Sequence, residues 1–199
     1  MRAILSVLLV ATTAAAAGGQ SAKVTLAPTS SITVEGTSNV HAWHATSTDI
    51  TSAIQMAAPA DAGSTVESVT LSLPVTSLKS GKGGLDKNLY KALKAEQNPT
   101  ITFVMKTYKV DAQAQAHAAE ITGLLTVNGV EKAITATATM TGDAKTGLKA
   151  VGSATFRMTD FGVKPVTALM GTIRTGDQVT VKFDLSGAAA QAVAELPND

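Results

Sequence analysis

Histidine is the residue type best suited to proton transfer or metal binding near neutral pH, and this 199-residue chain has three. His41 and His44 stand three apart in a stretch rich in threonine, serine and β-branched residues, which predicts a strand. On a strand this spacing directs the two imidazoles to opposite faces, so they cannot hold one metal ion unless a bulge intervenes. His117 stands in a polar stretch typical of solvent-exposed chain. Because the chain also has no cysteine, the sequence predicts no metal site and no cofactor.

Serine catalysis lacks a supporting pattern, because the chain contains no G-x-S-x-G turn. One enzymatic hypothesis stays open, in which His41 and Asp160 act as acid and base on a small exported substrate. It requires the two side chains to come within hydrogen-bond reach in a common pocket. Asp160 otherwise has the ordinary role of a capping or turn residue. Lys164 and Arg174 carry positive charge that suits a phosphate or another polar head group. No catalytic residue is assigned.

The N-terminal residues 1–17 resemble a secretory signal peptide, with Arg2, a short apolar run and small residues before the expected cleavage site. The apolar run falls short of the ~20 residues that span a bilayer, so no stable membrane insertion is expected. Removal of Arg2 leaves 15 basic against 15 acidic residues, and this balance disfavours nucleic acid as a partner. The sequence predicts a periplasmic or secreted protein, with one domain over residues 22–187 and an alanine-rich tail over 188–199.

Apolar and polar residues alternate through most of the domain, which is typical of half-buried strands. Asn128-Gly129 lies between two such runs and predicts a tight hairpin turn. One helix is expected over residues 85–96, where leucines recur at helical spacing. The expected strands are 22–26 and 31–36 (two strands or one interrupted strand), 39–56, 66–75, 100–110, 117–127, 130–142, 148–158 and 178–185. Within 100–110, alternation places Ile101, Phe103 and Met105 on one face and Lys106 and Tyr108 on the other.

Successive antiparallel strands in this number close most economically into a barrel, which leaves no exposed edge. The predicted fold is all-β: a lipocalin-like extended antiparallel eight-stranded β-barrel with one inserted helix. An eight-stranded barrel is either filled by side chains or wide enough for one small ligand. Many of the inward positions are small, which favours the ligand. These small residues are Ala136, Ala138, Ala150, Gly152 and Ala154.

Six groups of residues extend over nearly the whole domain. The groups are S-I-T-V-E-G-T-S-N-V-H-A-W from Ser31, L-P-V-T-S-L-K-S from Leu73 with L-D-K-N-L from Leu85, N-P-T-I-T-F from Asn98, G-L-L-T-V-N-G-V-E-K from Gly123, R-M-T-D-F-G-V from Arg157 and V-T-V-K-F-D-L from Val179. In these groups and in their order, the chain resembles the YceI family of secreted polyisoprenoid- or lipid-binding proteins.

The resemblance implies a barrel whose interior holds a long isoprenoid chain or a related amphiphile, without catalysis. The residues expected to line the interior are Trp43, Leu71, Phe103, Leu125, Ile134, Ala136, Ala138, Phe156, Phe161 and Phe183. The candidate head-group contacts are His41, Asp160, Lys164 and Arg174. Two alternatives remain: a structural or stress-response barrel filled by side chains, and the enzyme with His41 and Asp160. The sequence also leaves open a homodimer.

Overall fold

The structure is a computed structural model, which describes residues 21–58, 63–110, 117–143, 146–168 and 172–189. Its strands are β1 (Ser21–Leu26), β2 (Ser31–Ser38), β3 (Ala42–Ser47), β4 (Thr51–Ala57), β5 (Val66–Pro74), β6 (Thr100–Val110), β7 (Ala118–Val127), β8 (Val130–Asp143), β9 (Gly147–Arg157), β10 (Thr167–Ala168) and β11 (Ile173–Ala189). Its helical segments are η1 (Val75–Ser77), α1 (Gly83–Ala92) and η2 (Met158–Phe161). Within the described residues, no helix combines the length and apolar character needed to cross a bilayer.

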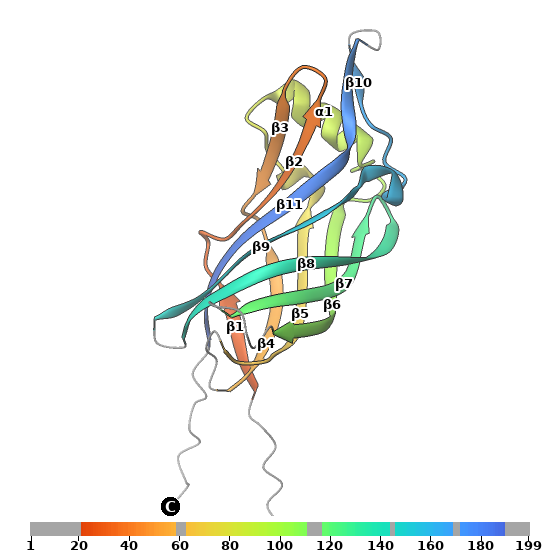
Figure 1. The fold of residues 1–199 in the computed structure, drawn as a ribbon. Coiled ribbons are helices and arrows are strands. Elements are labelled where there is room, and N and C mark those ends of the chain that lie inside the picture. Colours follow the sequence, from red (N-terminus) through yellow and green to blue (C-terminus); the bar gives the residue numbers. More distant parts are fainter. Residues whose placement is uncertain (1–20, 59–62, 111–116, 144–145, 169–171, 190–199) are drawn as a thin grey trace, which may run out of the picture.

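The strands form a closed antiparallel barrel (Figure 1). Hydrogen bonding runs in the order β1-β4-β5-β6-β7-β8-β9-β11, and β1 then pairs with β11 to close a ring of eight strands. The helix α1 lies at one end, here called the upper end, while β1 and β4 lie at the lower end (Figure 1). The predicted eight-stranded barrel with one inserted helix is therefore confirmed.

The upper end is extended by β2, which pairs with β11 from Thr175 to Asp184, and by β3, which pairs with β2. Since β1 pairs with the last residues of β11, β1 and β2 form one interrupted strand along it. The break lies at Pro28, which has no N–H to donate to a ladder. Ala27 and Ser30 instead form a turn, in which the Ser30 amide donates to the Ala27 carbonyl at 3.0 Å.

The single strand expected over residues 39–56 is wrong, because the chain forms two strands, β3 and β4, separated by residues 48–50. At the break the Asp49 amide donates to the Ser47 hydroxyl at 3.1 Å, and the same hydroxyl lies 2.6 Å from that of Ser77. A serine side chain that bonds its own neighbouring backbone offers an alternative to the strand ladder, and the strand ends there.

The helix α1 begins two residues before the predicted start and ends at Ala92, four residues before the predicted end. Leu93 caps the helix, because its backbone N–H donates a hydrogen bond to the Leu89 carbonyl. Lys94 then takes a positive φ of 49°, which ends the helix. Among the described residues, the second edge of β3 has one bridge, from Thr46 to Lys79, and α1 lies at this same end of the molecule (Figure 1).

Two further expectations change along β6 and β11. A bulge between Met105 and Thr107 shifts the alternation of β6, so Tyr108, expected on the outer face, lies on the inner face. β11 is 17 residues long and not eight, and it includes Ala188 and Ala189 from the predicted tail. Residues 1–17 and 190–199, to which the signal peptide and the rest of the tail were assigned, lie outside the described residues.

Candidate functional site

The inner faces of the eight strands enclose a cavity of about 450 Å³, here called the lumen. This volume falls within the ~300–1,000 Å³ typical of small-molecule sites. Two buried clusters contribute to its wall, an upper one next to α1 and a lower one around Met56 and Met140. The lumen therefore extends along the barrel, and its presence counts against the alternative of a barrel filled by side chains.

All ten residues expected to line the interior contribute to the wall of the lumen. They reach it because alternate residues of each strand point inward, as Leu125 and Val127 do on β7 and Ala136 and Ala138 do on β8. The alanines leave space that larger side chains would fill. That these residues bind a ligand stays a prediction.

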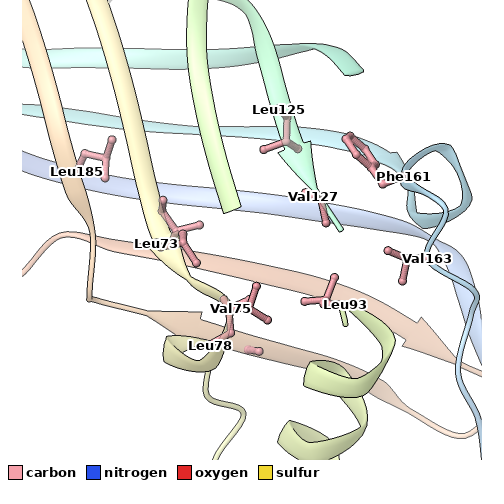
Figure 2. Close-up of a cluster of buried hydrophobic side chains, with 11 residues drawn as sticks. Leu73, Val75, Leu78, Leu93, Leu125, Val127, Phe161, Val163 and Leu185 are labelled. Carbon is pink, nitrogen blue, oxygen red and sulfur yellow. The ribbon is translucent and has the colours of Figure 1, made fainter. Parts of the chain in front are cut away.

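Figure 2 shows how the upper part of the wall is built. Leu125 and Val127 from β7 gather with Leu93 from the end of α1 and with Phe161 and Val163 from η2 and the segment after it. All are at least 91% buried, and the Phe161 ring packs edge-on against that of Phe156 at a centroid distance of 5.1 Å. Segments distant in the sequence thus form one rigid apolar surface.

Three aromatic rings of the wall lie over glycines of neighbouring strands. Trp43 lies over Gly36, its direct cross-strand partner, and Phe183 lies over its partner Gly152. Phe103 lies over Gly123, which is the direct partner of Met105 and so a diagonal neighbour of Phe103. A Cβ added at any of these glycines would overlap the ring above it. The glycines therefore let large rings lie close to the wall, so that the centre of the lumen stays open.

Polar side chains border the upper end of the lumen. His41, in the turn between β2 and β3, is exposed and contributes to the lining, as does Asn88 of α1. The Trp43 indole N–H already donates to the Thr37 carbonyl at 3.2 Å, and the Ser38 hydroxyl donates to the His41 carbonyl at 2.8 Å. This rim is open to water.

The other three candidate head-group residues lie elsewhere. Asp160, Lys164 and Arg174 are exposed and are not part of the lumen wall. The described hydrogen bonds do not join His41 to Asp160, the contact that the acid–base hypothesis requires. Among the described residues, no group of three side chains could hold a metal ion.

Sequence alternation placed Tyr108 on the face opposite Phe103, yet its side chain lines the lumen. Its hydroxyl donates to the Met140 sulfur at 3.3 Å, and burial raises the pKa of the phenol above its usual value. Tyr108 is half-buried and packs against the lower cluster, so its hydroxyl lies beside apolar side chains of the lumen wall. A bulge has no clear sequence signature, and strict alternation therefore assigned this residue to the wrong face.

The charge of the wall is low. Of the described residues that line the lumen, Lys149 carries the one permanent charge, and its ammonium lies 3.0 Å from the Asp184 carboxylate in a half-exposed ion pair. None of the described carboxylates contributes to the lining. The lumen can therefore remove an elongated apolar guest from water, but it offers a buried anion no free cation.

Comparison with known proteins gives a consistent result. The model of a family described as the YceI-like domain matches residues 20–187. A UPF0312 protein of Pseudomonas aeruginosa is 34% identical over 105 residues, which are 49% of this chain and 53% of the relative, so the chain spans about half the length of the curated relatives it matches.

Solved structures share the fold at low sequence identity. Burkholderia cenocepacia BcnA is 18% identical with a TM-score of 0.63, over 81% of this chain and 99% of that protein. A Saccharophagus degradans domain described as polyisoprenoid-binding is 13% identical with a TM-score of 0.60, over 84% and 98%. A Campylobacter jejuni YceI protein is 23% identical with a TM-score of 0.56, over 72% and 82%.

Proposed function

Because the chain belongs to the family of YceI-like domains, we propose that it binds a polyisoprenoid or a similar elongated lipid in the lumen, to sequester or carry it without catalysis. The observation that carries this proposal is the cavity of about 450 Å³ with its apolar wall. The structural neighbour described as polyisoprenoid-binding supports the choice of lipid class.

The driving force is the removal of apolar surface from water. Each 100 Å² of apolar surface that leaves water contributes about 2.5 kcal/mol. A long, narrow guest suits the site, because a strand of the length of β7, ten residues, rises about 33 Å. Binding of this kind requires no reacting group, in keeping with a wall formed mainly by aliphatic and aromatic side chains.

The direct test is native mass spectrometry of the protein purified from its own host, followed by organic extraction and identification of the lipid. We expect a stoichiometric isoprenoid or a related amphiphile. A folded protein that is repeatedly free of lipid and does not take up added isoprenoids would contradict the proposal. Trp43 is the one tryptophan of the chain and lines the lumen, so its fluorescence reports on uptake.

A substitution that fills the lumen gives a second test. Ala136 points into the lumen, whereas its neighbour Thr137 on β8 is exposed on the outer face. We expect Ala136→Trp to lower the affinity for isoprenoids at least tenfold, because the indole occupies space that the guest needs. Thr137→Trp introduces the same ring on the same strand and should leave the affinity unchanged. Equal effects of the two substitutions would argue against binding in the lumen.

Export to the periplasm or the medium is part of the same proposal and rests on the character of residues 1–17. N-terminal sequencing of the protein from a periplasmic extract should give a chain that begins close to residue 18. Recovery of the full-length chain from the cytoplasm would contradict export, without bearing on lipid binding.

A further inference from the structure

The two ends of the lumen differ in how their polar groups are satisfied. At the upper end, His41 and Asn88 are exposed and hydrated, and the hydrogen-bonding groups of Ser38 and Trp43 have protein partners. A polar ligand group that binds there replaces a hydrogen bond between the protein and water with a hydrogen bond between the protein and the ligand. The upper end therefore discriminates weakly among uncharged head groups.

The lower part of the lumen contains a donor with a poor partner. The Tyr108 hydroxyl donates to the Met140 sulfur at 3.3 Å, and a thioether is a weak acceptor. The other side chains of the lower cluster are apolar, among them Ile54, Met56 and Leu148. A guest that ended in hydrocarbon here would leave the donor with the sulfur alone, whereas a guest oxygen would supply a full hydrogen bond.

The charge of the wall restricts the chemistry of that oxygen. Lys149 is the one permanently charged residue among the described lining residues, and it is paired with Asp184 at the surface. A phosphate or carboxylate drawn into the lower lumen would lose its hydration without gaining a free cation, and such burial is costly. A hydroxyl or carbonyl oxygen has no such cost once it is hydrogen-bonded.

Building on the proposed lipid binding, we propose that the guest carries an uncharged oxygen acceptor and that Tyr108 binds this oxygen in the lower part of the lumen. An isoprenoid alcohol or ketone fits this description, whereas an isoprenoid pyrophosphate does not. A phenol is protonated at neutral pH, and burial moves the pKa of Tyr108 further in the same direction, so Tyr108 remains a donor.

Three probes that share a C20 isoprenoid chain test the proposal: geranylgeraniol, geranylgeranyl pyrophosphate and the corresponding hydrocarbon without an oxygen. Affinities are measured on the folded full chain by Trp43 fluorescence. We expect Tyr108→Phe to lower the affinity for the alcohol about 3- to 10-fold, the usual effect of losing one hydrogen bond. The affinity for the hydrocarbon should stay unchanged. The pyrophosphate should bind no more tightly than the alcohol.

The matched control is Tyr90→Phe, which removes the hydroxyl of the other tyrosine in the chain. Tyr90 donates to backbone carbonyls of Thr76 and Leu78 and is not part of the lumen wall. This substitution should lower stability while it keeps the alcohol-to-hydrocarbon affinity ratio of the wild type. Met140→Leu provides a second variant that keeps Tyr108. Removal of the competing sulfur should raise the affinity for the alcohol relative to the hydrocarbon.

The outcomes separate this inference from the proposed function. An equal effect of Tyr108→Phe on alcohol and hydrocarbon, or tighter binding of the pyrophosphate than of the alcohol, overturns the role of Tyr108 while lipid binding stands. A wild-type protein that binds none of the three probes overturns both.

Discussion

At the scale of single residues, Asn128 does more than form a turn. It has a φ of 53° and Gly129 one of 75°, as expected for the tight hairpin turn between β7 and β8. The Asn128 side chain is also buried, and its amide donates to the Phe161 carbonyl at 3.1 Å. This bond joins the hairpin to η2, two segments far apart in the sequence. The turn therefore helps to hold the Phe161 side of the lumen wall in place.

We expect Asn128→Gly to lower the free energy of unfolding by about 1–3 kcal/mol, the cost of leaving a buried carbonyl without its donor. Glycine tolerates the positive φ, so the substitution isolates the side-chain bond from backbone strain. Urea denaturation measures the effect. Asn88→Ala removes an exposed asparagine from α1 and should not destabilise the protein. An unchanged denaturation midpoint in Asn128→Gly would show that the bond contributes nothing.

A second residue-scale prediction concerns acid stability. The Asp177 carboxylate accepts hydrogen bonds from the Thr159 hydroxyl at 2.7 Å and the Thr159 amide at 2.9 Å. These bonds, the hydroxyl first, lower the pKa of Asp177. A carboxyl whose pKa is lower in the folded state stabilises the fold above the unfolded-state value of about 3.9, and this stability is lost as the pH falls through the folded-state value.

Asp177→Asn should therefore lower stability at pH 7 and flatten the loss of stability between about pH 5 and pH 2. Denaturation curves collected across this range measure the slope. Asp160→Asn removes an exposed carboxylate that accepts no described hydrogen bond, so it serves as the control for the loss of the bonds to Thr159. A wild-type slope in Asp177→Asn would contradict the prediction.

At the scale of elements, the wall is shaped by local departures from regular strands. The bulge in β6 turns Tyr108 inward, and the break after β3 lets the chain change direction between the extended upper end and the barrel. The third local feature is the set of aromatic rings that lie over glycines of neighbouring strands. Each ring covers part of two strands, so the two strands share one apolar surface toward the lumen. Aromatic side chains that cover glycines of a neighbouring strand also support the pairing of those strands.

Gly36→Ala tests this arrangement at β2 and β3. The added methyl group would overlap the indole of Trp43, so the ring must move from its place against the wall. We expect a shift in the Trp43 emission spectrum and a loss of about 1–3 kcal/mol of stability, as is usual for overpacking. Gly83→Ala adds a methyl group in open space at the start of α1 and should change neither quantity. An unaltered emission spectrum in Gly36→Ala would contradict the prediction.

At the scale of the whole molecule, barrel closure depends on β1. Three residue pairs join it to β11, namely Val24–Ala189, Thr25–Ala188 and Leu26–Gly187. By contrast, β7 pairs with β8 along its full length from Ala118 to Val127. Short pairings of this kind open at lower free energy than long ones, because fewer hydrogen bonds and contacts must break together.

We therefore expect the amides of β1 to exchange with deuterium faster than those of β7 and β8, as measured by hydrogen-exchange mass spectrometry at neutral pH. Val24 and Leu26 line the lumen, so if lipid binds there as proposed, saturation with lipid should slow exchange in β1. Equal exchange rates in β1 and β7 would show that closure is not the weak point of the barrel.

The barrel, its helix and ten residues of its wall could be predicted from the sequence, because strand alternation and the Asn128-Gly129 turn are local properties that the residues encode directly. Its order of motifs also led to the family. Alternation placed Leu125 and Phe183 inward correctly, since β7 and the last half of β11 are regular.

The end of β3 and the inward position of Tyr108 depend on contacts between residues far apart in the chain, so they become apparent only in the tertiary structure. The side chain of Ser47 meets that of Ser77 where β3 ends, and the bulge in β6 follows from its pairing with β7. Neither contact is visible in a local pattern, and so the sequence joined β3 to β4 and put Tyr108 on the outer face. The Tyr108 hydroxyl faces the lumen because the register between β6 and β7 shifts by one residue at the bulge.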